Sequence, residues 1–344
     1  MLKRIKKLFL CSCKTVGVFA LASRSRWRRN RLLILAYHGV SLDDEHLWDP
    51  ELYMSPKRFG ERMKLLKQSG CTVLPLGEAL HELYEGRLPE MSVALTFDDG
   101  AYDFYEQAYP IINYHKFPVT IYLTTFFSEY NRPVFDVACS YLLWKGQNRA
   151  INLKEFTGLD IGLDLSKAET RAFARGALLG FARQNSMTAE ERDAIAARLA
   201  QTLNIDYEVL LKKRLLHLLA PHEVRELASA GVDIQLHTHR HRNPEAQNLF
   251  AREINDNRSS IQAMTGSHPS HFCYPGNVYS EDYSSWLREL GVVSATTCEC
   301  GIASRRSNPM LLPRLVDNSL LSRIEFQAWL SGVASVLPRR SSAE

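Results

Sequence analysis

The sequence predicts an α/β protein built on a parallel sheet or barrel. Short apolar segments, each long enough for one buried strand, alternate with amphipathic segments long enough for helices. This alternation fills the first 125 residues, stops near residue 128 and resumes at about residue 220. Parallel strands need crossover connections, usually helices, so we expect the chemistry at the carboxyl ends of the strands.

The individual elements follow from apolar runs and from the residues that bound them. The expected strands are 32–37, 71–74, 92–97, 119–124, 232–236, 271–274 and 292–297. The first expected helix begins after Ser55, which suits the N-cap position before Pro56, and ends at Gly70. The remaining helices of the alternating pattern are expected at 76–84, 104–115, 221–230, 248–265 and 280–290.

Residues 128–219 interrupt the alternation. Helices are expected over 166–183 and 188–203, which are rich in Ala, Leu, Arg and Glu, and Thr188 to Glu191 fits a capping box. The sequence therefore predicts one domain over residues 32–337 with a helical insertion at about 128–219. A polar tail is expected over 338–344.

Composition and charge restrict the class of protein. With 45% hydrophobic and 23% charged residues, the chain as a whole is neither disordered nor a multi-span membrane protein. The net charge is +4, but residues 1–31 contain ten Lys or Arg and no Asp or Glu. A basic end on an acidic remainder favours an anionic membrane surface over nucleic acid, for which a basic domain would be expected.

Residues 1–31 are predicted to form a basic helix that lies on a membrane or packs on the domain. The alternative is a signal peptide, with apolar residues Leu8–Ala22 and cleavage near Ala22. Lys14 opposes insertion of this run, at roughly 2.5–3.5 kcal/mol for a helix centre. Seven cysteines without a C-x-x-C pair fit a reducing compartment. We therefore expect a cytoplasmic protein at the periphery of the inner membrane, with export after cleavage as the alternative.

Two adjacent carboxylates, Asp98 and Asp99, follow the strand predicted over 92–97. Carboxylates at such a place are costly unless a cation or hydrogen bonds compensate them. Their side chains diverge, so one could bind a metal while the other acts on a water molecule. The alternative is a solvated Asp-Asp-Gly turn at Gly100.

His237 and His241 follow the strand predicted over 232–236. Imidazole is a common ligand of divalent metals, and a spacing of four allows one turn to bring both rings onto one ion. With Asp99 they would form a His-His-carboxylate site that leaves positions for water and substrate. The alternative is a surface histidine cluster. His239 is expected to have a structural role, because alternate side chains of an extended segment point apart.

Thr96-Phe97-Asp98-Asp99-Gly100, together with His237-Thr238-x-x-His241, resembles the motifs of the polysaccharide deacetylase family, the family-four carbohydrate esterases. The similarity covers residues 32–127 and 220–316. It implies a distorted, incomplete (β/α) barrel. It also implies that Asp98 is the catalytic base and that Asp99, His237 and His241 bind a divalent metal, usually zinc.

A third motif departs from the commonest pattern of that family. Many members have Arg-x-Pro-Tyr-Gly, whose arginine contacts the base, whereas this chain has Tyr274-Pro275-Gly276-Asn277. This segment resembles a Tyr-Pro-x-Gly variant with Asn277 in place of glycine, and asparagine tolerates left-handed backbone. The backbone N–H of Gly276 is then the candidate oxyanion donor. Arg314 is the candidate replacement for the missing arginine; the alternative is a surface role.

His38 is the candidate general acid. Many family members carry the acid in a C-terminal Leu-x-His motif, but this chain has no histidine after His271. Tyr37-His38-Gly39-Val40 instead resembles the circularly rearranged branch, which includes deacetylases of exported N-acetylglucosamine polymers and carries its acid on the N-terminal strand. A structural histidine is the alternative.

The resemblance implies hydrolysis of the N-acetyl group of an amino sugar in a glycan, with release of acetate. The alternatives are a carbohydrate-binding relative without turnover and a metal-dependent hydrolase of a non-sugar amide. The substrate could be a polymer, an oligomer or a lipid-linked sugar. The sequence does not indicate an oligomeric state.

Overall fold

Seven parallel strands form a closed ring at the centre of the computed structural model, which describes residues 2–336. Pairing of the last strand of the ring with the first closes it. In order around the ring, the strands are β1 (Arg31–Tyr37), β13 (Leu312–Val316), β11 (Ser294–Cys300), β10 (His271–Cys273), β9 (Asp233–Leu236), β6 (Thr120–Leu123) and β5 (Ser92–Phe97). The predicted barrel is confirmed, with seven strands where a complete (β/α)₈ barrel has eight.

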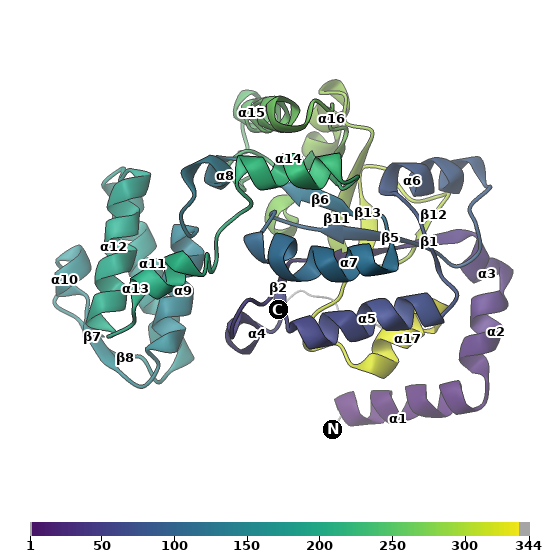
Figure 1. The fold of residues 1–344 in the computed structure, drawn as a ribbon, viewed down its shortest axis with the longest axis horizontal. Coiled ribbons are helices and arrows are strands. Elements are labelled where there is room, and N and C mark those ends of the chain that lie inside the picture. Colours follow the sequence, from purple (N-terminus) through teal and green to yellow (C-terminus); the bar gives the residue numbers. More distant parts are fainter. Residues whose placement is uncertain (1, 337–344) are drawn as a thin grey trace.

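Two short strands extend the sheet beyond the ring, and helices cover its outside (Figure 1). β4 (Thr72–Val73) pairs with β5, and β12 (Ala303–Ser304) pairs with β1 in the antiparallel sense. Every residue of β5 is buried, as expected for a parallel strand that is covered on both faces. The outer helices are α5 (Pro56–Gln68), α6 (Leu76–Glu85), α7 (Tyr109–His115), α14 (Pro221–Ser229), α15 (Gln247–Thr265), α16 (Glu281–Glu289) and α17 (Arg323–Ser331).

Local chemistry explains where two of these helices begin. The hydroxyl of Ser55 accepts a hydrogen bond from the Arg58 backbone at 3.4 Å and caps α5, as predicted. The helix expected over 104–115 instead begins as a π-helix (Phe104–Ala108) before α7. The Tyr109 N–H donates to the Phe104 carbonyl five residues earlier, which is the π-helical pattern. Pro110, the next residue, has no backbone N–H and so cannot donate a helical hydrogen bond.

Strand β13 is not among the strands predicted from the sequence. It contains Pro313, which cannot donate to a ladder and argues against a central strand. The structure accommodates the proline because β11 has an irregular register at this point, where Thr296 opposes Leu312 and Cys300 opposes Arg314. On its other side, β13 pairs with β1 only through Leu315 and Val316. Arg314, the residue after this proline, is fully buried.

A helical unit lies beside the barrel where the sequence predicts an insertion (Figure 1, left). Its own hydrophobic core draws on residues between Phe135 and Leu216. The capping box at Thr188 is present. The elements of this segment are α8 (Phe126–Tyr130), α9 (Phe135–Lys145), β7 (Ala150–Asn152), α10 (Lys154–Thr157), β8 (Gly162–Asp164), α11 (Ala168–Gln184), α12 (Ala189–Thr202) and α13 (Tyr207–Lys212).

The helical unit is attached to the loop that follows β1. This loop contains β2 (Gly39–Val40), α4 (Glu45–Trp48) and β3 (Tyr53–Met54). Asp44 accepts a hydrogen bond from the Tyr141 hydroxyl at 2.6 Å and forms an ion pair with Lys145. Lys213 lies 2.5 Å from Asp43. The loop that follows His38 in the sequence is thus held by side chains of the helical unit.

The N-terminal segment forms three helices, which corrects the prediction of one. They are α1 (Leu2–Thr15), α2 (Val18–Arg24) and α3 (Arg26–Arg29). Gly17 has a left-handed φ of 82°, which ends α1, and extended Ser25 caps α3. Among residues 2–336, no helix is long and apolar enough to cross a membrane. The predicted tail 338–344 lies outside the described residues.

A buried ion pair joins α5 to the end of β13. The Nε atom of Arg62 lies 2.9 and 3.1 Å from the two carboxylate oxygens of Asp317, and the Tyr37 hydroxyl donates to Asp317 at 3.1 Å. Burial raises the pKa of Asp317 to about 6, although Arg62 and Tyr37 oppose this shift. The contribution of Asp317 to stability is therefore fully present below its unfolded pKa near 4 and is lost as the pH rises through about 6.

Arg62→Met should destabilise the protein in a pH-dependent manner. The variant leaves Asp317 buried without its cation, which should lower the free energy of unfolding by about 3–5 kcal/mol at neutral pH. The loss should be clearly smaller at pH 5, where Asp317 is protonated in the folded state. Urea unfolding at both pH values measures this, and the double variant Arg62→Met/Asp317→Asn should lose the pH dependence. An equal loss at both pH values would contradict the assignment.

Candidate active site

Polar residues gather at one end of the barrel because the parallel strands all end there. His38 follows β1, Asp98 and Asp99 follow β5, and His237 follows β9. Gly276 lies just beyond β10, and Arg314 lies within β13.

Asp99, His237 and His241 form a compact cluster, as the sequence analysis expects. One ligand atom from each side chain lies within 4.8 Å of the others. The Nε2 atoms of both histidines are 3.1 Å from Asp99 Oδ1, and the two ring centroids are 5.0 Å apart. Asp99 and His241 are partly open to solvent, so the cluster is accessible from outside.

The hydrogen bond on the far side of His237 indicates that the cluster suits a cation. His237 Nδ1 lies 2.8 Å from the carbonyl oxygen of Cys273, so Nδ1 must carry the hydrogen. In a neutral ring Nε2 is then an acceptor that faces Asp99 Oδ1, another acceptor, at 3.1 Å. Such a contact needs a cation or a proton between the atoms. A carbonyl that orients the second ring nitrogen is also the usual outer partner of metal-binding histidines. These three side chains therefore fit a divalent metal.

The charges of the cluster reinforce one another. Burial opposes ionisation of Asp99, but His241 and His237 outweigh it and hold the pKa of this carboxyl well below its usual range. Burial likewise lowers the pKa of His241, but the negative charge of Asp99 dominates and raises it. The site thus stabilises the ionised carboxylate that a metal ligand requires.

The backbone of the cluster is strained. Asp99, Thr238 and His241 have left-handed φ values of 67°, 61° and 53°. Each such conformation costs on the order of 1–3 kcal/mol and persists only where the surroundings enforce it. The Thr238 hydroxyl accepts a hydrogen bond from the Arg242 backbone at 3.1 Å, which braces the turn between the two histidines.

Two buried residues of α15 hold the histidine loop, and the sequence analysis does not identify them. Glu253 accepts hydrogen bonds from the Arg240 backbone at 2.9 Å and from Arg242 Nε at 2.7 Å. The side-chain oxygen of Asn257 accepts from the His237 backbone at 2.9 Å, and its amide donates to the Leu123 carbonyl at 2.9 Å. Glu253 and Asn257 are four residues apart on a predicted helix, a spacing that places them on one face.

His239 stands apart from the cluster, as predicted. Its Nδ1 atom lies 2.8 Å from the Thr125 hydroxyl, and its ring meets Phe126 edge-on. Burial lowers its pKa. His239 therefore fixes the loop to the end of β6 and does not face Asp99.

Asp98 forms a buried, bidentate ion pair with Arg314. Nη1 of Arg314 donates to Asp98 Oδ1 at 2.7 Å and Nη2 donates to Oδ2 at 2.6 Å. Both side chains are buried, so Arg314 is not a surface arginine. Burial favours the neutral form of Asp98, but the charge and hydrogen bonds of Arg314 outweigh it, and the pKa of Asp98 is lowered. A fork-to-fork pair of this kind also fixes the orientation of the carboxylate.

The remaining donors of Arg314 are satisfied by the barrel wall. Nε donates to the Thr297 carbonyl at 2.9 Å, and Nη1 also donates to the Thr96 hydroxyl at 3.1 Å. The Cys273 sulfur lies 3.0 Å from Nη2, and burial raises the pKa of this thiol well above its usual value. Cys273 thus acts as a neutral acceptor in this environment.

His38 lies next to Asp98. Its Nε2 atom is 3.7 Å from Asp98 Oδ2, and its side chain retains some exposure. Its Nδ1 atom is buried and has no hydrogen-bond partner among the described residues. Nε2 is therefore the nitrogen that His38 presents to the site.

Gly276 lies in an exposed turn at the same end of the barrel. Gly276 and Asn277 have left-handed φ values of 61° and 57°, so Asn277 does adopt the left-handed backbone that asparagine tolerates. The Asn277 side-chain oxygen accepts a hydrogen bond from the Cys298 backbone at 2.6 Å, which ties the turn to β11. The Asn243 amide donates to the Pro275 carbonyl at 2.8 Å from the opposite side.

Comparison with protein families agrees with these motifs. The model of the family described as polysaccharide deacetylase matches residues 85–155 and 183–295, just over half of the chain. The chain belongs to the polysaccharide deacetylase family. The matched segments contain the Asp98–Asp99 pair and both histidines of the cluster.

Relatives and solved structures of polysaccharide deacetylases are similar to this chain. A poly-β-1,6-N-acetyl-D-glucosamine N-deacetylase of Staphylococcus aureus is 36% identical over 72 residues, which are 21% of this chain and 25% of that relative. The deacetylase PplD of Streptococcus pyogenes, solved with acetate, has a TM-score of 0.57 at 18% identity and covers 90% of this chain and 99% of its own. IcaB of Ammonifex degensii has a TM-score of 0.54 at 17% identity, with 88% and 97% covered. The alignment with the S. aureus relative thus spans a quarter of its length, and the two structures show a shared fold.

Replacing His237 or His241 by alanine should abolish high-affinity binding of zinc. Loss of an outer hydrogen-bond partner alone costs about 10- to 100-fold in metal affinity, so loss of a ligand should cost more. His239→Ala, in the same loop, is the matched control and should bind zinc like the wild type. Competition with a chromogenic chelator measures the affinities. If His239→Ala were as damaging as the other two, the ligand assignment would fail.

Proposed function

We propose that the protein removes the acetyl group from an N-acetylated amino sugar in a glycan by metal-dependent hydrolysis, releasing acetate. The observation that carries the proposal is the Asp98–Arg314 pair beside the Asp99–His237–His241 cluster. A fixed, ionised carboxylate thus lies next to three side chains that suit a divalent metal. Zinc is the metal we propose, because it is bound by such sets of nitrogen and oxygen ligands.

Asp99, His237 and His241 would hold the metal, which when bound would supply Lewis-acid polarisation of the acetamide carbonyl and a more acidic water. Asp98 would accept a proton from the attacking water as it adds to that carbonyl. Arg314 touches Asp98 from the side buried in the barrel. It is therefore a positioning residue that keeps Asp98 ionised and oriented.

His38 would complete the reaction as general acid. Protonated at Nε2, it would give a proton to the amine as the carbon–nitrogen bond breaks, so that a neutral amino sugar leaves together with acetate. The backbone N–H of Gly276 would stabilise the negative oxygen of the tetrahedral adduct. The left-handed turn at Gly276 and Asn277 supports this role.

Acetate release across a small glycan panel tests the proposal. The name of the S. aureus relative makes β-1,6-linked N-acetylglucosamine oligomers the first substrate to try. The panel should add chito-oligomers, a lipid-linked N-acetyl sugar and a simple non-sugar acetamide. Release from at least one glycan by zinc-loaded protein is expected. Binding of glycans without release would instead identify a carbohydrate-binding protein, and release from the simple amide alone would identify an amidase of another class.

Asp98→Asn should lower kcat by about 10²- to 10⁴-fold, the usual contribution of a general base. Arg314→Lys should also lower kcat with little change in KM, because Arg314 acts through Asp98. The double variant should be no slower than Asp98→Asn alone, since a positioning residue has nothing left to position. Steady-state kinetics on one glycan measures all three variants. Independent, multiplying losses would remove Arg314 from this role.

His38→Ala should slow hydrolysis of the amide while leaving the zinc content unchanged. The expected loss in kcat is about 10²- to 10⁴-fold. Hydrolysis of 4-nitrophenyl acetate should suffer much less, because its leaving group needs no proton. Asp98→Asn should be slow on both substrates. Equal losses on amide and ester in His38→Ala would show that His38 is not the acid.

A further inference from the structure

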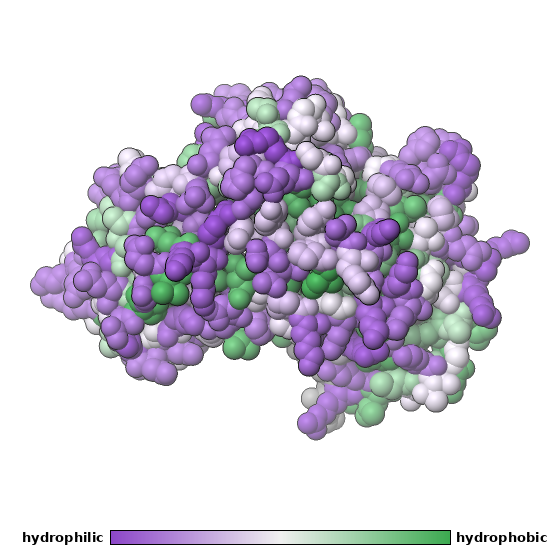
Figure 2. All heavy atoms as spheres, in the orientation of Figure 1, coloured by the Kyte–Doolittle hydropathy of each residue, from purple (hydrophilic) through white to green (hydrophobic). Residues whose placement is uncertain are grey.

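We propose that the outer face of the N-terminal helices α1, α2 and α3 binds the surface of an anionic lipid bilayer. This N-terminal face consists of the apolar residues Ile5, Leu8, Phe9, Val16 and Leu21 and the basic residues Arg4, Lys7, Arg24 and Arg26. Figure 2 shows the mixture of apolar and strongly hydrophilic residues over these helices at the lower right. The proposal is independent of the proposed activity.

The apolar residues of the N-terminal face are unusually exposed. Leu8 is 68% exposed and Phe9 52%, while Val16 and Leu21 are both 72% exposed. Ile5, Leu8 and Phe9 are spaced at i, i+3 and i+4, so they lie on one side of α1. Large apolar side chains grouped in this manner on a surface mark a site of interaction.

The opposite side of the same helices is fixed to the barrel. Leu10 is fully buried and Phe19 nearly so, and both belong to the main core. Lys6 lies 3.1 Å from Glu325 of α17, and Lys14 donates to Gln327 at 2.8 Å. Because these contacts determine which side of α1 faces inward, the apolar side chains of the N-terminal face are held outward. The inward contacts also favour a segment that stays attached to the folded barrel.

The charge of the segment selects the partner. Residues 1–31 contain ten Lys or Arg and no acidic residue. Arg4, Lys7, Arg24 and Arg26 are exposed, and none of them forms an ion pair with a described acidic residue. Basic side chains around an apolar stripe complement anionic headgroups above acyl chains. A protein partner would need a matching acidic and apolar surface, which nothing in the fold indicates.

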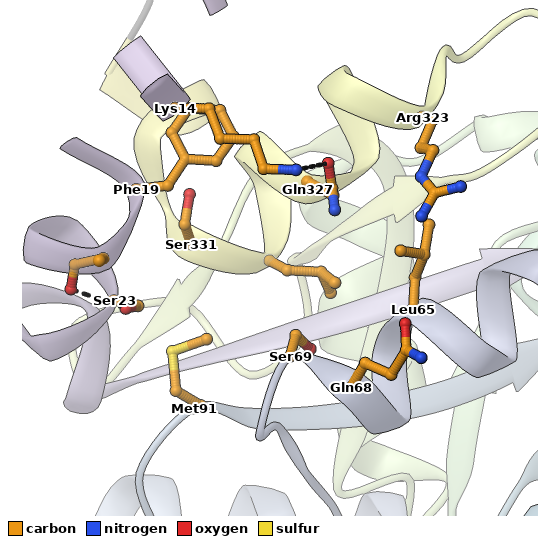
Figure 3. Close-up of a pocket in the computed structure, with 12 residues that line it drawn as sticks. Lys14, Phe19, Ser23, Leu65, Gln68, Ser69, Met91, Arg323, Gln327 and Ser331 are labelled. Carbon is orange, nitrogen blue, oxygen red and sulfur yellow. Dashed lines mark hydrogen bonds between the residues drawn. The ribbon is translucent and has the colours of Figure 1, made fainter. Parts of the chain in front are cut away.

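A groove lies on the inner side of these helices, where α1 and α2 meet the barrel (Figure 3). It has a volume of about 270 Å³ and lies between α2, α5 and α17. Phe19, Leu65 and Met91 supply apolar walls, while Lys14 and Arg323 supply positive charge. This combination suits an anionic headgroup joined to apolar chains. None of the candidate active-site residues lines the groove.

Sedimentation with lipid vesicles tests the proposal. The full-length protein should bind vesicles of phosphatidylcholine that contain phosphatidylglycerol, and should bind pure phosphatidylcholine much more weakly. Binding should weaken between about 0.1 M and about 1 M salt, because the Debye length falls from roughly 10 to 3 Å. Equal binding to both vesicle types, or no binding to either, would overturn the proposal.

Matched variants distinguish vesicle binding through the N-terminal face from nonspecific binding through any exposed apolar or basic residues. Leu8→Ser/Phe9→Ser should weaken vesicle binding by more than about tenfold, as should Arg4→Gln/Lys7→Gln. Leu159→Ser/Phe173→Ser is the apolar control, since these residues of the helical unit are 49% and 51% exposed. Arg183→Gln/Lys212→Gln is the charge control. Equal losses of vesicle binding in the variants and the controls would contradict the proposal. So would a protein that does not bind vesicles but forms a concentration-dependent dimer, if Leu8→Ser/Phe9→Ser abolishes that dimer.

Discussion

The buried pair of Asp98 and Arg314 is the interaction on which the rest of the site depends. Burying two charges costs several kcal/mol per ion unless each is fully hydrogen-bonded. Here both carboxylate oxygens are paired, and the arginine also donates to Thr297 and Thr96. The pair connects β5 with β13, which are not neighbours in the ring. The barrel therefore supplies, through its closed geometry, a carboxylate that stays ionised and cannot turn away.

This constraint separates the roles of two adjacent aspartates. With Asp98 held by Arg314, the left-handed backbone at Asp99 directs its carboxylate to His237 and His241. His237 is itself fixed by the Cys273 carbonyl, which faces its ring, and by Asn257, which accepts from its backbone. Asp98 and Asp99 thus follow the same strand but face different partners, and Cys273 contacts both groups, Arg314 through its sulfur and His237 through its carbonyl. The N-terminal face contains none of these residues, so the two proposals stand on separate parts of the molecule.

The sequence predicts the barrel and most of this site because both depend on local patterns. Apolar runs identify the buried strands, and the paired aspartates and histidines directly follow two of them. The sequence analysis cannot locate β13, because Pro313 argues against a strand and only the irregular register of β11 accommodates it. It also misses Glu253 and Asn257, since polar residues on a helix resemble a solvent-facing side until the histidine loop covers them. The breaks at Gly17 and Ser25 rest on local features, a left-handed glycine and a capping serine, which the sequence analysis did not use.

Hydrolysis in heavy-oxygen water tests the central claim most directly. Zinc-loaded protein would be incubated with an N-acetylated glycan oligomer, and the released acetate would be analysed by mass spectrometry. If Asp98 activates water for attack on the acetamide, each acetate should carry one heavy oxygen atom, and the glycan should carry a free amine and no label. Acetate without label, or an acetyl group transferred to another acceptor, would contradict the account.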